Sequence, residues 1–333
     1  MKMSSIRSIL STRAQHFSRF SSLRSSSRRW YAAANDIEGM LQEKEKWENV
    51  PGDIRKLAVF AEHARAHNYQ IPLLSKAQRG NFDQRKAYHI ASAIRKLREM
   101  NGEVVAGRKV GFTNRNIWPE YGIDASNWSY VYQNTVIDLP AKNELGEGKV
   151  VLANISHLSA MEPKIEPEII FGLKNAIKSS MTDLELLSSI DWVAHGFEVV
   201  ASIYPHWKFT AADTTAGFAL HALLLVGPRL WLKGGDDEDS LLHSLRDFKV
   251  KLLRNGETVD QGTGSNVLGS PINALRHLAE LLEKDEFNNP VEPGEVVTTG
   301  TLTRALDIKN GDLWSTRIEG IDLPGLDVSF KLD

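Results

Sequence analysis

The chain has 333 residues, of which 42% are hydrophobic and 25% are charged, and its formal net charge at pH 7 is −2. This length is enough to bury a sizeable core in one or two domains. The absence of cysteine excludes disulfides, thiolate catalysis and cysteine-ligated zinc sites. The longest apolar runs, such as 218–227, are too short to span a membrane, so we expect a soluble protein without a membrane partner.

Residues 1–31 differ from the rest of the chain in charge. They hold seven basic residues and no acidic one, and apolar residues alternate with the arginines among many serines. This composition is typical of a mitochondrial transit peptide, with a processing point near Tyr31, and the alternative is a basic tail that binds nucleic acid or acidic lipid. Removal of these seven charges takes the net charge from −2 to −9, which disfavours nucleic acid as a partner.

Residues 36–106 are predicted to form a helical N-terminal region, because apolar residues recur there at helical spacing. The pattern is clear over 53–67 and again over 83–102, where Asp83 is a candidate N-cap and Gly102 a candidate stop.

Residues 107–333 are predicted to be mainly β, because short apolar runs alternate with Gly, Pro, Asn and Asp. The pair Asn255-Gly256 between two such runs predicts an exposed hairpin turn. Two helices are expected within this part, at 181–190 with Thr182 as N-cap and at 270–285, and the acidic stretch 234–240 is expected to be a solvated loop.

Three glutamates lie in otherwise apolar segments. Glu166 and Glu168 are two apart in a predicted strand and therefore share one face, and Glu198 lies in a second apolar segment. Such carboxylates repel one another unless arginine or a cation neutralises them, and no arginine is close to either segment in the sequence. A site made only of carboxylates suits Mg²⁺ or Mn²⁺. The spacing alone is compatible with a metal site and with a structural network of ion pairs. If it is a metal site, we expect three unpaired carboxylates in the protein without its ion.

The order of several motifs is more specific than any one of them. The segments 107–114, 162–173, 206–214, 264–275 and 296–303, with Glu198 between the second and third, follow one another as in a known family. The chain resembles the 2-keto-4-pentenoate hydratase and 4-oxalocrotonate decarboxylase family of the fumarylacetoacetate hydrolase superfamily. The resemblance implies an α+β fold, with a mixed β-roll at 107–333 behind the helical region, and a homo-oligomer.

The resemblance also implies a site. It assigns Glu166, Glu168 and Glu198 to a Mg²⁺ or Mn²⁺ ion and Lys109 to catalysis, through an enolate of a small 2-oxo acid that the metal stabilises. The residues that it implies for substrate binding are Gly111, Phe112, Lys208, Thr299, Gly300 and Thr301.

The chain departs from the family pattern at the proton-transfer residues. Asn127 stands where the hydratases carry an aspartate that helps proton transfer, and Asp124 is close to it in sequence. His195 is interpreted as a core histidine rather than an acid or base. We expect a hydratase-like lyase in the mitochondrial matrix; the alternatives are a decarboxylase of an oxalocrotonate- or oxaloacetate-like acid, an acylpyruvate hydrolase, or a non-catalytic metabolite-binding protein.

The targeting segment gives a direct prediction. Because residues 1–31 are basic, free of acids and interleaved with apolar residues, we expect import into mitochondria and cleavage near Tyr31. N-terminal sequencing of the protein from its native cell checks this, and a chain that keeps Met1 there would contradict it.

Overall fold

The computed structural model describes residues 49–78, 81–141, 149–235 and 238–333, together with residues 37, 39, 41 and 144. The predicted targeting segment 1–31 lies outside the described residues. None of the helices in these ranges is long and apolar enough to cross a bilayer.

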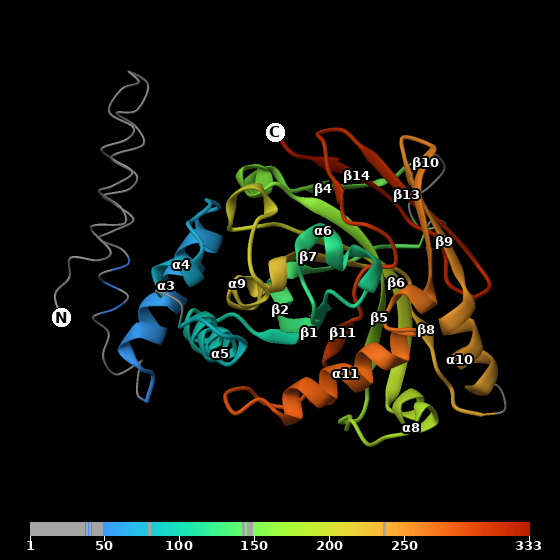
Figure 1. The fold of residues 1–333 in the computed structure, drawn as a ribbon. Helices are drawn as coiled ribbons and strands as arrows, with labels where there is room; N and C mark the ends of the chain where they lie inside the picture. The colour runs from blue at the N-terminus through green and yellow to red at the C-terminus, as the bar shows by residue number, and fades with distance from the viewer. Residues whose placement is uncertain are drawn as a thin grey trace.

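The N-terminal region is helical, as predicted, and its helices lie together at one side of the strands (Figure 1). They are α3 (Gly52–Ala66), α4 (Leu74–Ala77) and α5 (Gln84–Met100). The predicted cap of α5 is confirmed, because the Asp83 side chain accepts a hydrogen bond from the backbone N–H of Lys86. Gly102, just beyond the end of α5, has the left-handed φ of +81° that glycine adopts at low cost.

A large mixed sheet carries the candidate site. In the described part of the chain it has nine strands, in the order β2-β1-β11-β5-β6-β7-β3, with β12 beside β5 and β8 beside β6. Its strands are β1 (Val105–Gly111), β2 (Asn127–Tyr132), β3 (Val136–Asp138), β5 (Lys164–Leu173), β6 (Ile190–Val200), β7 (His221–Val226), β8 (Leu230–Trp231), β11 (Val296–Thr298) and β12 (Leu306–Asp307). Pairs β1–β11 and β3–β7 are parallel, whereas the long β5–β6 pair is antiparallel.

A second sheet of five strands, again among the described residues, has the order β10-β9-β13-β14-β4. These strands are β4 (Val151–Asn154), β9 (Lys249–Arg254), β10 (Glu257–Thr263), β13 (Leu313–Glu319) and β14 (Asp327–Lys331). The turn Asn255-Gly256 joins β9 to β10 and is exposed, which confirms the predicted hairpin. Two mixed sheets with helices around them confirm the predicted α+β fold.

Of the remaining helices, α8 and α10 lie on the side away from α3 and α4, and α11 runs along the bottom of the view in Figure 1. These remaining helices are α6 (Trp118–Tyr121), α8 (Asp183–Ser188), α9 (Ala211–Ala216), α10 (Glu238–Asp247) and α11 (Pro271–Glu283). Helices α8 and α11 correspond to the two expected helices, and Thr182 caps α8 through the N–H of Glu185.

The acidic stretch 234–240 was wrongly expected to be only a loop, because its last residues begin helix α10. Glu238 and Asp239 lie in the first turn of that helix, where their negative charge is favourable near the N-terminal end of the helix dipole.

The helical region and the strands share a core. One cluster of buried apolar side chains joins Ile54 and Ile90 of the helices to Phe197 of β6 and Phe330 of β14. The helices are therefore packed onto the sheet that carries the glutamates.

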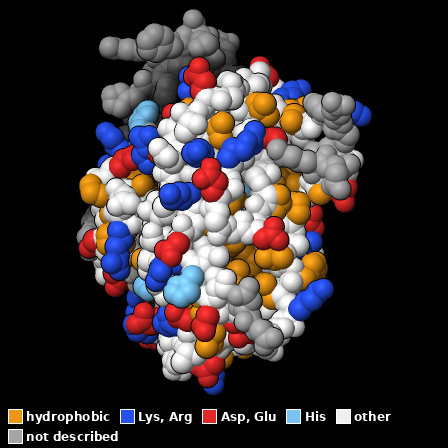
Figure 2. All heavy atoms as spheres, turned by 90° about the vertical axis from the view of Figure 1, so that its right-hand side faces the viewer, with side chains coloured by type: hydrophobic (Ala, Val, Ile, Leu, Met, Phe, Trp, Pro, Cys, Tyr) orange, Lys and Arg blue, Asp and Glu red, His pale blue; other side chains and the backbone are white. Residues whose placement is uncertain are grey.

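The face shown in Figure 2 carries basic and acidic side chains intermixed, with hydrophobic side chains between them.

Candidate functional site

Strand pairing brings the three predicted glutamates together. Glu166 of β5 lies directly opposite Glu198 of β6, and Glu168 follows two residues later on the same face. All three are buried, and one carboxylate oxygen from each lies within 4.8 Å of the others. Strands β5 and β6 are thus neighbours in the sheet, as a site shared by the three glutamates requires.

Glu168 is fixed by strand β11 and the turn after it. Its Oε2 atom accepts a hydrogen bond from the Thr298 hydroxyl and another, of 2.8 Å, from the backbone N–H of Gly300. Gly300 has a φ of +94°, and a Cβ there would lie 1.9 Å from Thr113 Oγ1, so this position requires glycine. Oε1 of Glu168 has no hydrogen-bond partner among the described residues, which leaves it available to a cation.

Glu198 is held by a histidine that the sequence did not reveal. His221 at the start of β7 places Nδ1 2.6 Å from Glu198 Oε1, and its Nε2 lies 2.8 Å from the Thr135 hydroxyl. Both Glu198 and His221 are buried. His221 lies in an apolar run that predicted only a strand, so no local signal in the sequence marked it.

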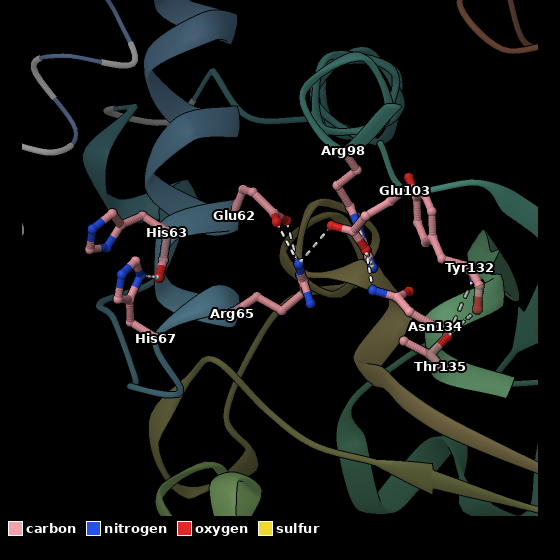
Figure 3. Close-up of polar contacts among 9 residues, drawn as sticks. All are labelled: Glu62, His63, Arg65, His67, Arg98, Glu103, Tyr132, Asn134 and Thr135. Atoms are coloured by element: carbon pink, nitrogen blue, oxygen red, sulfur yellow. Dashed lines mark hydrogen bonds and ion pairs between the residues drawn. The ribbon is translucent and has the colours of Figure 1, made fainter. Parts of the chain in front are cut away.

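The helical region contacts the segment that contains Thr135 and so supports the series of contacts from Thr135 through His221 to Glu198 (Figure 3). The Thr135 hydroxyl lies 2.8 Å from the backbone oxygen of Tyr132, whose ring packs against the Arg98 guanidinium at 3.5 Å from the ring centroid. Arg98 is buried and forms a 2.6 Å ion pair with Glu103, which also lies 3.5 Å from Arg65 of α3. Helices α3 and α5 thus contact the segment that orients His221.

Lys109 corrects the expectation of three unpaired carboxylates. The side chain is buried, and its Nζ lies 2.9 Å from Glu198 Oε2 and 3.7 Å from Glu166 Oε2. No arginine lies near these glutamates in sequence, but β1 brings this lysine to them from more than fifty residues earlier in the chain. One ammonium faces three carboxyl groups, so it cannot compensate the charge of all three if they are ionised.

The pKa values of the three glutamates are shifted in different directions. Burial, with the charge of Glu198, raises the pKa of Glu166 to about 7 despite the opposing charge of Lys109. Burial and the two neighbouring carboxylates also raise the pKa of Glu168 well above its usual value. Burial disfavours the charge on Glu198 as well, but Lys109 and His221 together outweigh it and lower the pKa of Glu198. The unrelieved repulsion is therefore concentrated on Glu166 and Glu168.

These residues fit a hard divalent cation. Three carboxylates supply oxygen ligands of the kind that Mg²⁺ and Mn²⁺ prefer, and Glu168 keeps an oxygen to which no described residue donates a hydrogen bond. A divalent charge would relieve the repulsion that raises the pKa values of Glu166 and Glu168.

A small pocket borders the glutamates. It is lined by Lys109, Gly111, Phe112, Ile117, Tyr121, Glu166, Trp207, Ala219, Leu220, Gly300 and Thr301. The predicted substrate-binding residues Gly111, Phe112, Gly300 and Thr301 are among them. Thr299 is buried behind the pocket, with its hydroxyl on the backbone oxygen of Ile169, and Lys208 is exposed and does not line the pocket.

Asn127 lies behind Gly111 rather than in the pocket wall. The two residues are paired across β1 and β2, and a Cβ on Gly111 would lie 2.6 Å from Asn127 Oδ1. Its Nδ2 donates hydrogen bonds to the hydroxyls of Thr214 and Thr215, at 2.8 and 3.0 Å. Asp124 is exposed. The predicted catalytic role of Asn127 stays a prediction.

His195 is a core histidine, as interpreted from the sequence. It is buried between the backbone oxygen of Glu168, 3.0 Å from its Nδ1, and the Thr316 hydroxyl, 2.9 Å from its Nε2. Burial lowers the pKa of His195 to about 4, so the ring is neutral near pH 7. It supports the backbone of β5 at Glu168 without facing the pocket.

Known proteins resemble this chain in sequence. Residues 133–323 match the family described as fumarylacetoacetate (FAA) hydrolase, C-terminal. The chain is 30% identical over 236 residues to 2-hydroxyhexa-2,4-dienoate hydratase of Comamonas testosteroni, across 71% of this chain and 82% of that one. It is 28% identical to 2-keto-4-pentenoate hydratase of Burkholderia vietnamiensis, across 80% of this chain and 94% of that one.

Among solved structures, the chain is similar to 4-oxalocrotonate decarboxylase from Pseudomonas putida G7, complexed with magnesium and adipate. The TM-score is 0.70 at 24% sequence identity, and the likeness covers 83% of this chain and 97% of that one. At this identity the likeness shows the fold.

Glu168→Gln separates a metal site from a structural ion-pair network. The substitution keeps an acceptor for Thr298 and Gly300 and replaces the carboxyl by a neutral group, the state that the raised pKa of Glu168 already favours, so the apo melting temperature should hold or rise. Stabilisation by Mg²⁺, about 2.7 kcal/mol for wild type at a hundredfold excess over the dissociation constant, should largely disappear. Thermal melts with and without Mg²⁺ measure both effects.

Glu295→Gln is the matched control for that experiment. Glu295 pairs with the buried Arg108 at 2.8 Å, away from the three carboxylates, so this variant should lose about 1–3 kcal/mol without metal and keep the full Mg²⁺ shift. If Glu168→Gln behaves like Glu295→Gln, the three glutamates form a structural network and not a metal site.

The raised pKa values predict how the apo protein responds to pH. Glu166 has a pKa of about 7 in the folded protein and about 4.5 when unfolded, so the folded state holds its proton more tightly. The tighter binding of this proton adds to the free energy of unfolding. The contribution is complete below about pH 4.5 and is lost as pH rises through about 7, which lowers the free energy of unfolding by about 3 kcal/mol.

Mg²⁺ competes with those protons, so its stabilisation should be small at about pH 5 and large at about pH 8. Melting temperatures across this range, with and without Mg²⁺, check the prediction. A metal-induced shift that is the same at both ends would contradict protonation of Glu166 and Glu168 in the apo site.

Proposed function

Because the chain belongs to the fumarylacetoacetate hydrolase family, we propose that it is a divalent-metal-dependent lyase of the hydratase type that acts on a small 2-oxo acid. The observation that carries the proposal is the group of three buried carboxylates with Lys109 at the edge of a pocket. The curated relatives at 28–30% identity are named hydratases, which supports an enzyme of this kind.

Glu166, Glu168 and Glu198 would hold the ion, which when bound supplies a Lewis acid for the oxygens of a 2-oxo acid. Thr298 and Gly300 orient Glu168, and His221 orients Glu198, so hydrogen bonds fix the positions of two of the three carboxylates that would hold the ion.

Lys109 supplies a fixed positive charge beside the reacting oxygen. Its burial disfavours the charged form, but the three carboxylates outweigh that cost and hold the pKa of Lys109 above its ordinary value. The ammonium therefore stays charged near pH 7 and can stabilise negative charge that develops on the 2-oxo oxygen. It is a weak proton donor and cannot serve as a base in this state.

Tyr121 offers the pocket a second donor. Burial and nearby carboxylates raise the pKa of its hydroxyl, so it remains a neutral O–H group near pH 7. Together with Lys109, it could direct a proton or a hydrogen bond at the substrate from the wall of the pocket.

A hydrolase would need a histidine–glutamate pair that holds a water, for which the sequence offers His157 and Glu162. Glu162 accepts a hydrogen bond from Gln70 and another from the backbone N–H of His206, both of 3.3 Å. No contact between His157 and Glu162 occurs in the described residues, so the geometry favours the lyase.

Localisation in the mitochondrial matrix and assembly into a homo-oligomer are further parts of the proposal. The first is supported by the composition of residues 1–31 and the second by the resemblance to the family.

The proposal is tested by incubating the mature protein with Mg²⁺ and a panel of 2-oxo acids and their 2-hydroxy-dienoate forms. Consumption should require Mg²⁺ and should give addition of water without release of CO₂. Lys109→Met should reduce turnover by about a hundredfold or more while Mg²⁺ still binds, because the variant removes a cation from beside the ion.

Lys174→Met is the matched control, since Lys174 is an exposed lysine at the end of β5 and should turn over like wild type. Release of CO₂ would assign a decarboxylase instead. Turnover that is indifferent to Mg²⁺ and to Lys109→Met would contradict the proposed site.

A further inference from the structure

On the basis of the proposed function, we infer that the pocket selects 2-oxo monocarboxylic acids that carry an uncharged aromatic tail. The specificity is determined by three rings that line the pocket, Phe112, Tyr121 and Trp207. These three residues are called the ring wall below.

The pocket lining combines polar groups with large apolar side chains. Lys109 and Glu166 supply the charged groups, next to the other two glutamates. The ring wall, with Ile117 and Leu220, supplies the large apolar side chains. A ligand that fits this lining has a polar head for the 2-oxo acid chemistry and a hydrophobic tail.

The rings are packed against one another and against Phe209. Tyr121 stacks on Phe209 with a centroid distance of 6.0 Å and an interplanar angle of 12°. Phe112 meets Tyr121 edge to face at 5.9 Å, and Trp207 lies 6.1 Å from Tyr121. A cluster of fixed rings offers both flat faces and edges, which is the environment that another aromatic ring prefers.

The backbone that presents these rings is strained and held in place. Phe112 and Trp207 have left-handed φ values of +56° and +53°. The backbone oxygen of Phe112 accepts hydrogen bonds from Trp118 Nε1 and the Ser126 hydroxyl, and Trp207 Nε1 donates to the backbone oxygen of Glu162. Left-handed conformations of large residues persist where the surroundings enforce them, and they cluster at functional sites. The ring wall is therefore a fixed feature of the pocket.

Charge around the pocket disfavours a second carboxylate. Among the described residues that line it, Lys109 is the one cation, and the glutamates already pair with it. Lys164 lies 4.9 Å from the centre of the Trp207 ring, but it is paired with Asp307 at 3.1 Å. A distal carboxylate would thus be desolvated among the rings without a free partner. An uncharged tail meets no such cost.

The inference is tested by calorimetric binding of four 2-oxo acids to the Mg²⁺-loaded protein. The probes are pyruvate as the head alone, 2-oxohexanoate with an alkyl tail, 2-oxo-4-phenylbutanoate with an aromatic tail, and 2-oxoadipate with a second carboxylate. The aromatic acid should bind at least about tenfold more tightly than pyruvate and more tightly than the alkyl acid. The diacid should bind at least about tenfold more weakly than the aromatic acid.

Variants of the ring wall test which residues carry the preference. Trp207→Leu should reduce the preference for the aromatic acid over the alkyl acid by about tenfold, and Trp207→Phe should restore most of that preference. Trp231→Leu is the matched control, because Trp231 is 57% exposed on β8 and does not line the pocket. Circular dichroism and the Mg²⁺ titration confirm that each variant is folded.

The outcomes separate this inference from the proposed function. If pyruvate binds with Mg²⁺ but the diacid binds as tightly as the aromatic acid, or if Trp207→Leu keeps the wild-type preference, the tail specificity is wrong and the proposed function stands. If Mg²⁺ binds but none of the four acids does, the proposed function is wrong and the inference falls with it.

Discussion

The burial of like charges on paired strands is the constraint on which the site depends. Antiparallel pairing places Glu166 opposite Glu198, and the period of a strand adds Glu168 to the same face. Removing these groups from water disfavours their charged forms, and each carboxylate also disfavours the charge on the others. The surrounding elements can be understood by how they distribute and offset that repulsion.

The glutamates differ in how far neighbouring groups offset their negative charge. Glu198 pairs with Lys109 from β1 and with His221 from β7, and it is the one whose pKa is lowered. Glu168 receives only neutral donors, from Thr298 and Gly300, and it keeps an unpartnered oxygen. The protein thus fixes the positions of the three groups but leaves part of their charge uncompensated, which is the condition that favours uptake of a divalent cation.

The sequence predicted what depends on local periodicity and on motif order. The strands of Glu166 and Glu198, the caps Asp83 and Thr182 and the hairpin at Asn255-Gly256 follow from such signals. It did not predict contacts that tertiary pairing creates. His221 resembles any polar residue at the start of a strand, and the compensation of the glutamates by Lys109 depends on strand order. Helix α10 was missed because its acidic first turn also has the composition of a solvated loop, and exposed Lys208 shows that a motif match does not fix where a side chain points.

The central claim is that these carboxylates form one divalent-cation site, and the most direct measurement is anomalous scattering from crystals soaked in Mn²⁺. The account predicts a single strong peak within about 2.0–2.3 Å of one oxygen from each of Glu166, Glu168 and Glu198. It also predicts that Lys109 remains beside Glu198. A site without a peak at saturating Mn²⁺, with the Lys109 ammonium placed among all three carboxylates, would contradict the account.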